Sequence, residues 1–167
     1  MAGLPIVRFP HPLLTRPTRS IERVDREVKR LIDAMVATMR HHPRCVGLAA
    51  PQVGSGLRVA VMDASHHPKV PKAHGLLVLI NPEIKASEGR VIQREGCLSV
   101  PDFTANVSRV TRISLSAMDE FGSIRSLWLE GFEAIIAQHE IDHLDGKLFL
   151  DRVANVKTDI FRRKNYL

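Results

Sequence analysis

Apolar residues near the start of the chain recur at the spacing of an α-helix. Residues 1–20 contain several prolines and are expected to form an extended arm. After this arm, apolar side chains repeat every three or four positions at Val24, Val28, Leu31, Ile32, Met35 and Met39. Ser20 is a suitable N-cap, Glu22 falls in the first turn, and Pro43 follows the expected end. The pattern predicts an amphipathic helix that begins at Ser20 and buries one face.

The next apolar stretches have the composition of β-strands. Runs rich in Val, Leu and Ile at residues 57–62 and 76–80 predict two strands, and the second is expected to end at Asn81-Pro82. Residues 91–95 predict another short strand.

Alternation of apolar and polar residues from Val107 to Met118 predicts a single half-buried strand. The sequence Asp119-Glu120-Phe121-Gly122 is typical of a turn, so residues 124–129 are expected to pair back as a hairpin. A second helix is predicted from about Gly131, with Gly146 as its stop. The final residues form a short basic tail or helix.

Composition places the chain among ordinary globular proteins. Its 167 residues are 44% hydrophobic and 25% charged, which fits one domain over residues 1–167. A net charge of +6 favours acidic surroundings such as RNA or the ribosome, but no motif for specific DNA binding is present. The sequence predicts neither a membrane span nor a signal peptide, and two cysteines favour a reducing compartment, so we expect a cytoplasmic protein.

The second predicted helix carries a metal-binding pattern. His139 and His143 are four residues apart, so both imidazoles can reach one metal ion from the same face. Glu140 follows the first histidine, where its carboxylate can reach a water molecule activated by that ion. Asp142 should point away from the metal and pair with a cation, which we predict to be Arg109.

Two histidines are too few for a stable catalytic site, which normally has three protein ligands. No histidine follows His143, and we choose Cys97 as the third ligand because a thiolate binds borderline metals tightly. Were Cys45 also a ligand, the site would be a closed structural tetrahedron. We expect that it is not.

Three segments of the chain closely resemble the peptide deformylases in order and spacing. They are Gly47-Leu48-Ala49-Ala50-Pro51-Gln52, Glu95-Gly96-Cys97-Leu98-Ser99, and Gln138-His139-Glu140-Ile141-Asp142-His143-Leu144-Asp145-Gly146. The resemblance implies removal of the formyl group from N-formylmethionyl peptides. It also implies one divalent metal ion on Cys97, His139 and His143, with Fe²⁺ as the native ion and Zn²⁺, Ni²⁺ or Co²⁺ as substitutes.

The same resemblance assigns roles to individual residues. Glu140 would be the general base and then the general acid, while the Gln52 side chain and the Leu98 backbone N–H would hold the oxyanion. The Val46-Gly47 backbone would pair with the peptide as an added strand. Further residues would bind the substrate or line its methionine pocket: Val46, Glu95, Gly96, Phe132, Ile135, Ile136 and His139.

The chain departs from the family pattern in three places. Cys45 stands where a glycine is usual, and Thr104 stands where some members have an arginine that helps to bind substrate. The C-terminal tail is shorter than in members that dock on ribosomes with a long helix, so a transient ribosome contact is left open.

The expected fold is α+β. Antiparallel strands would pack around a central helix that carries the HExxH motif and binds the metal, and the N-terminal helix would lie on the outside. Two other functions remain as alternatives: a metalloprotease that uses the same HExxH chemistry, and a non-catalytic module stabilised by its metal ion.

Overall fold

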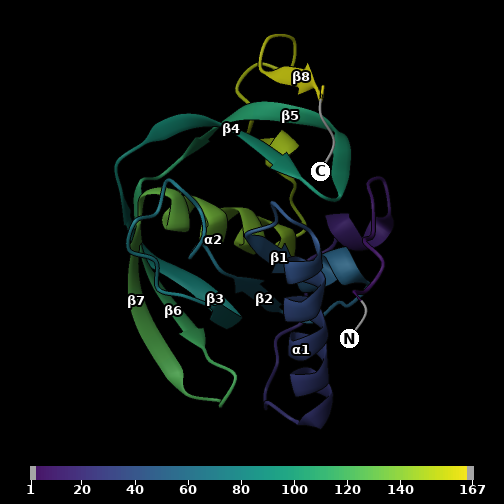
Figure 1. Ribbon diagram of the computed structural model, residues 1–167, viewed down its shortest axis with the longest axis vertical. Coiled ribbons are helices and arrows are strands. Elements are labelled where there is room, and N and C mark those ends of the chain that lie inside the picture. The colour runs from purple at the N-terminus through teal and green to yellow at the C-terminus, as the bar shows by residue number, and fades with distance from the viewer. Residues whose placement is uncertain (1–2, 165–167) are drawn as a thin grey trace.

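Two antiparallel sheets form the framework of the computed structural model, which describes residues 3–164 (Figure 1). The larger sheet has the order β1-β2-β3-β6-β7, with strands Gly47–Ala49, Val59–Met62, Leu77–Glu88, Arg112–Met118 and Ile124–Glu130. The smaller sheet has the order β4-β5-β8, with strands Val91–Cys97, Val100–Arg109 and Ile160–Arg162. The α+β class is therefore confirmed.

Two α-helices cover opposite faces of the larger sheet. Successive residues of a strand point to opposite faces, and in β2 all four side chains are buried. Val59 and Val61 pack with α1 (Arg26–His41), whereas Met62 packs with α2 (Gly131–Leu144). Figure 1 shows α2 between the two sheets, and most of its side chains are buried, including polar ones. Helix α2 ends just before Gly146, as predicted.

Three short 3₁₀-helices connect these elements: η1 (Pro12–Thr15), η2 (Ala50–Val53) and η3 (Phe149–Arg152). The first of them interrupts the otherwise extended N-terminal arm. The arm is held along the body by backbone hydrogen bonds, including Val7 N–H to Gln52 O and Phe9 N–H to Ser99 O.

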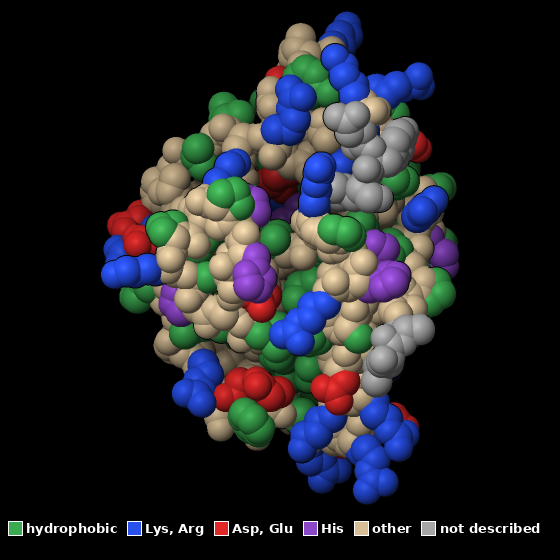
Figure 2. Space-filling view, viewed as in Figure 1, with side chains coloured by type: hydrophobic (Ala, Val, Ile, Leu, Met, Phe, Trp, Pro, Cys, Tyr) green, Lys and Arg blue, Asp and Glu red, His purple; other side chains and the backbone are tan. Residues whose placement is uncertain are grey.

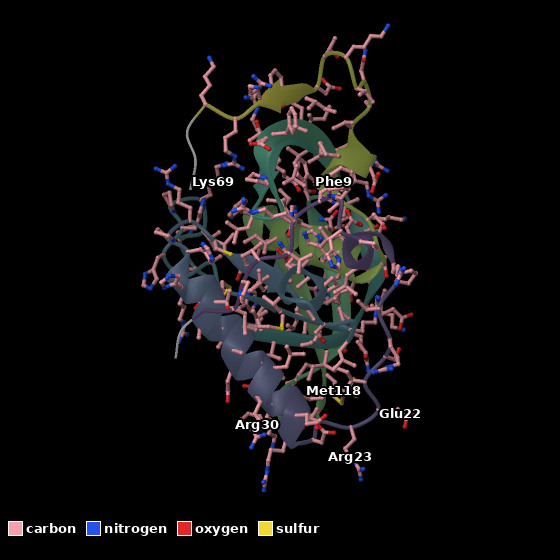
Figure 3. All side chains as sticks on the ribbon, turned by 90° about the vertical axis from the view of Figure 1, so that its right-hand side faces the viewer. Phe9, Glu22, Arg23, Arg30, Lys69 and Met118 are labelled. Carbon is pink, nitrogen blue, oxygen red and sulfur yellow. The ribbon has the colours of Figure 1, made fainter. Side chains whose placement is uncertain are left out.

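The predicted start of the first helix is wrong. Helix α1 begins at Arg26, and its N-cap is Asp25, whose side chain accepts the N–H of Val28 at 2.9 Å. The earlier start fails because the backbone of Ile21 is held by the Asn81 side chain, through hydrogen bonds of 2.9 and 2.6 Å. The charged residues Glu22, Arg23 and Arg30 mark this end of the molecule, far from Phe9 and Lys69 (Figure 3).

Two strand boundaries also differ from the prediction. Strand β3 continues through Asn81-Pro82 to Glu88, because this dipeptide makes an irregularity in the pairing with β6 and does not end the strand. The single strand predicted from Val107 to Met118 is two strands in different sheets. The break occurs at Val110, whose N–H and carbonyl both bind the side chain of Gln138 on α2.

The predicted hairpin is confirmed, with its turn closed by Gly122 N–H donating to Asp119 O at 3.0 Å. Within the basic tail, Ile160–Arg162 form the strand β8 and not a helix, and β8 pairs with β5 through Arg162 opposite Phe103 and Phe161 opposite Thr104. Residues 165–167 of this tail lie outside the described residues. Among the described residues, neither α-helix is both long and apolar enough to cross a bilayer.

Candidate active site

Three side chains of metal-ligand type converge where the end of β4 meets α2. Cys97 is the last residue of β4, and His139 and His143 lie one turn apart on α2. Their donor atoms all lie within 4.8 Å of one another, and Cys97 Sγ is 3.3 Å from His143 Nε2. Within residues 3–164 this is the one group of histidine, cysteine and carboxylate donors arranged so closely. A thiol with two imidazoles is a donor set suited to iron, nickel, cobalt or zinc.

The surroundings of Cys97 favour its ionised form. Burial alone would raise the pKa of the thiol, but the neighbouring imidazoles of His143 and His139 hold that pKa well below its usual range. The thiolate is the form of cysteine that binds a metal ion. The electrostatics of this residue therefore fit the role of a ligand.

His139 is oriented by a buried carboxylate. Its Nδ1–H donates to Glu95 Oε1 at 2.8 Å, which leaves Nε2 for the metal-ligand group. Glu95 in turn accepts two hydrogen bonds from Arg109, at 2.7 and 2.9 Å. Burial opposes ionisation of Glu95, yet the hydrogen bonds from Arg109 and His139 lower its pKa to about 2. Glu95 is thus a buried anion that fixes the orientation of the His139 ring.

The network continues from Arg109 to Asp142. The Asp142 carboxylate accepts a hydrogen bond from Arg109 at 2.6 Å and two from Arg152, at 2.8 and 3.2 Å. The predicted pairing of Asp142 with Arg109 is confirmed, and the helical spacing explains it, since residue 142 is rotated away from the face shared by residues 139 and 143. Arg109 on β5 thus joins the smaller sheet to α2 directly through Asp142, and indirectly through Glu95, which is bonded to His139.

Glu140 lies buried beside the metal-ligand group. Its Oε2 has no hydrogen-bond partner among the described residues. Its Oε1 lies so near β1 that a Cβ atom at Gly47 would stand 2.6 Å from it. Burial raises the pKa of Glu140 to about 7, against the opposing effect of the two histidines. A carboxylate with a pKa in this range can both accept and release a proton near neutral pH.

Gln52 places an amide at the same point. The residue is buried in η2, and its Oε1 accepts the N–H of Ala49 at 2.9 Å. Because the oxygen is occupied, the NH₂ group is directed toward Cys97 Sγ at 3.4 Å and Ser99 Oγ at 3.2 Å. The glycine- and alanine-rich segment before it lets β1 approach α2 closely.

One cavity of about 310 Å³ brings the predicted site residues together. It opens between β1, β4 and α2, and Figure 2 shows a hollow in the middle of this face. Every predicted site residue except His143 lines it: Val46, Gly47, Gln52, Glu95, Gly96, Cys97, Leu98, Phe132, Ile135, Ile136, His139 and Glu140. His143 is not part of the cavity lining, but its Nε2 is 3.3 Å from Cys97 Sγ, which is.

Cys45 lies in the cavity wall but outside the metal-ligand group of the described chain. Its thiol donates to the carbonyl oxygen of Gly47 at 3.1 Å. Burial raises the pKa of this thiol to about 12, so Cys45 stays protonated at neutral pH. A protonated thiol is a poor metal ligand.

Sequence reasoning missed several residues of the site. The sequence did not predict the two hydrogen bonds from Arg109 to Glu95, nor Arg152 as a partner of Asp142. The cavity is also lined by Arg44, Arg94 and Arg163, which sequence reasoning counted only as part of the net positive charge. These residues come from separate elements, so only the folded topology shows that they share one rim.

The chain is similar to known proteins in both sequence and structure. The family described as polypeptide deformylase matches the chain over residues 3–159. A peptide deformylase of Syntrophobacter fumaroxidans is 41% identical over 98% of this chain and 94% of its own length. The crystal structure of a peptide deformylase from Legionella pneumophila has a TM-score of 0.84 at 38% identity, covering 93% of this chain and 89% of that one.

A second solved structure is of a peptide-bound relative. The Met-Ala-Ser-bound peptide deformylase of Acinetobacter baumannii, of class I type b, has a TM-score of 0.84 at 33% identity and covers 91% of this chain and 99% of that one. The likeness in sequence and in structure extends over nearly the whole chain. This chain therefore belongs to the peptide deformylase family.

Proposed function

We propose that this chain hydrolyses the formyl group from the N-terminal methionine of formylated peptides and releases formate. The observation that carries the proposal is the position of Glu140. Its carboxylate is buried beside Cys97, His139 and His143, and one of its oxygens has no partner among the described residues. A general base is thus placed at the metal-ligand group, inside a cavity that substrate can enter.

Cys97, His139 and His143 would hold one divalent metal ion, which we propose is Fe²⁺ in its native state, with Zn²⁺, Ni²⁺ or Co²⁺ as substitutes. The ion, when bound, supplies the Lewis acidity that activates water and polarises the formyl oxygen. Three protein donors are the number found in catalytic sites, whereas structural sites have four. This favours an enzyme over a module that only needs metal for its stability.

Glu140 would move the proton of the reaction. Its carboxylate accepts a proton from the attacking water as the new C–O bond forms. The same proton then passes to the nitrogen of the methionine as the C–N bond breaks, which gives formate and a free amine. Glu95 and Arg109 take no part in this transfer, and they hold His139 in place.

The negative charge that develops on the formyl oxygen needs hydrogen-bond donors. The Gln52 amide is fixed by its bond to Ala49, so its NH₂ group can serve without a change of position. The backbone N–H of Leu98, in the same cavity wall, is the second donor that we propose.

The substrate peptide would lie along the edge of β1. This strand is at one end of its sheet, so an extended peptide can add to it at Val46-Gly47. Gly96 on β4 lies in the same cavity. The apolar side chains of Phe132, Ile135 and Ile136 offer a slot for a methionine side chain. A relative solved with Met-Ala-Ser bound supports a methionyl peptide as the ligand.

A cytoplasmic location and a transient contact with the ribosome complete the proposal. Formylated peptides are made on ribosomes, and the net charge of +6 favours an approach to RNA.

Formate release tests the proposal directly. The metal-free protein is loaded separately with iron, nickel, cobalt and zinc, and each form is mixed with formyl-Met-Ala-Ser. Formate and free Met-Ala-Ser should appear in equal amounts, while acetyl-Met-Ala-Ser stays intact. Cleavage of an internal bond would instead identify a metalloprotease, and the absence of formate with every metal would overturn the proposal.

A further inference from the structure

The last described strand brings an arginine to the wall of the active-site cavity. Strand β8 pairs with β5, and the ladder continues beyond it because Arg163 N–H donates to Asp102 O at 2.8 Å. Its side chain lines the cavity together with residues of the catalytic group. The main chain at this position is therefore fixed, although it lies close to the end of the chain.

A glycine on β4 provides the space that this side chain occupies. Gly96 pairs with Thr104, and Thr104 pairs with Phe161, so these residues form a row across one face of the smaller sheet. Arg163 is two residues beyond Phe161 and points to the same face. A Cβ atom at Gly96 would collide with Nη2 of Arg163, and Thr104 Cγ2 would be 3.4 Å from it. The guanidinium thus lies over the backbone next to Cys97.

The guanidinium is not fully used by the protein. Nε of Arg163 is buried and has no hydrogen-bond partner among the described residues. A buried donor without a partner is costly, which suggests a ligand group that completes its bonds. The two carboxylates that line the cavity do not serve it: Glu95 is bonded to Arg109 and His139, and Glu140 is on α2 beside the metal ligands.

Two further arginines stand at the same opening. Arg44 precedes β1 and Arg94 is on β4, where its guanidinium lies 3.7 Å from the centre of the Phe161 ring. Both are exposed, and with Arg163 they form what we call the arginine rim. Figure 2 shows Lys and Arg side chains around the hollow. A positive rim around a concave site attracts anionic ligands.

We propose that Arg163 is a specificity-determining residue that binds a carboxylate of the substrate beyond its N-terminal methionine, with Arg94 and Arg44 raising the local positive charge. The inference rests on the proposed function. The carboxylate comes from an acidic side chain at the second or third residue, or from the C-terminus of a short peptide. Either source offers the two oxygens that a guanidinium binds in pairs.

The test compares kcat/KM for matched peptides in the metal-loaded enzyme. Formyl-Met-Asp-Ala-amide and formyl-Met-Ala-Asp-amide carry a side-chain carboxylate, formyl-Met-Ala-Asn carries only a terminal one, and formyl-Met-Ala-Asn-amide carries none. For at least one anionic peptide, kcat/KM should be about fivefold higher than for the neutral peptide, which is the ratio expected for a partly exposed ion pair. This preference in kcat/KM should come from a lower KM for the anionic peptide. It should be smaller at about 500 mM salt than at about 20 mM salt, because salt screens the ion pair.

Arg163→Gln should bring the ratio of kcat/KM between the anionic and the neutral peptide close to one, and Arg163→Lys should retain part of the preference. Arg162→Gln is the matched control, because Arg162 is adjacent and exposed on the other face of β8. The inference would be overturned if Arg163→Gln and the unchanged enzyme had the same ratio of kcat/KM between anionic and neutral peptides. A ratio in the unchanged enzyme that is close to 1, or that does not depend on salt, would also overturn it. If no peptide released formate, the proposed function itself would fail.

Discussion

Substitution of Arg109 by methionine should destabilise the fold strongly. Only 3% of the arginine is exposed, and it donates three hydrogen bonds to two buried carboxylates. Without Arg109, Glu95 has His139 as its one remaining side-chain partner among the described residues. Asp142 then has Arg152, whose side chain is 42% exposed. Loss of one partner from a buried charged network costs ~3–5 kcal/mol. Methionine fills much of the volume of the arginine stem, so the charge accounts for most of that loss.

Arg112→Met is the matched control on the surface. Arg112 and Glu88 approach to 2.6 Å, the same distance as Arg109 and Asp142, but their side chains are 43% and 60% exposed. Exposed ion pairs contribute ~0–1 kcal/mol because water and salt screen them. The two ion pairs therefore differ in burial at the same shortest distance. They also differ in their other contacts, because Arg109 bonds a second carboxylate and Arg112 lies 4.2 Å from the centre of the Trp128 ring.

Urea unfolding of both variants, with and without metal, measures the difference. The free energy of unfolding should fall by ~3–5 kcal/mol for Arg109→Met, which corresponds to roughly 6–20 °C in the melting temperature. It should change by less than ~1 kcal/mol for Arg112→Met. Adding Glu95→Gln to Arg109→Met should restore part of the loss, because one unpaired charge is removed. Equal losses in the two single variants would refute the reasoning.

Four further outcomes concern the cavity. Glu140→Gln should retain its metal and lose ~100- to 10,000-fold in turnover, and near-normal rates of formate release would remove the carboxylate from the mechanism. Gly47→Ala should displace the Glu140 side chain, since its methyl group would stand 2.6 Å from Oε1, so turnover should drop while metal content measured by absorption spectrometry stays the same. Metal titration should show no tight site in Cys97→Ala but one metal per chain in Cys45→Gly, and metal loss in both would indicate a closed site. Iodoacetamide should modify Cys45 at a rate that still rises at pH 10, because its pKa of about 12 keeps the thiolate scarce, whereas a plateau near pH 8 would contradict that burial effect.

The parts of the fold that local pattern determines could be predicted from the sequence. The helical spacing of 139 and 143 places two imidazoles on one face, and the same spacing rotates Asp142 toward Arg109. The turn at 119–122 is a local feature, so the β6–β7 hairpin followed from it. The short runs at β2 and β3 were recognisable because both of their faces are buried.

The remaining features depend on contacts between distant residues. Val110 is out of phase with Val107 and Ile113, but nothing local reveals that Gln138 on α2 divides this run into strands of two sheets. Ser20 is as good a cap as Asp25, and the choice depends on Asn81 holding Ile21. The position of Arg163 depends on β8 pairing with β5 and on the space left by Gly96, which no periodicity encodes.

The cavity lies between two strand edges, and this has a consequence for the colloidal behaviour of the protein. Strands β1 and β4 are terminal in their sheets, and residues from both line the cavity. An open edge can pair with any extended chain, including another copy of the same protein. The short length of β1 and the exposed charge of Arg94 on β4 limit such pairing. A peptide that covers these edges should therefore slow aggregation as well as occupy the site, so concentrated stocks should keep longer with product bound than when empty.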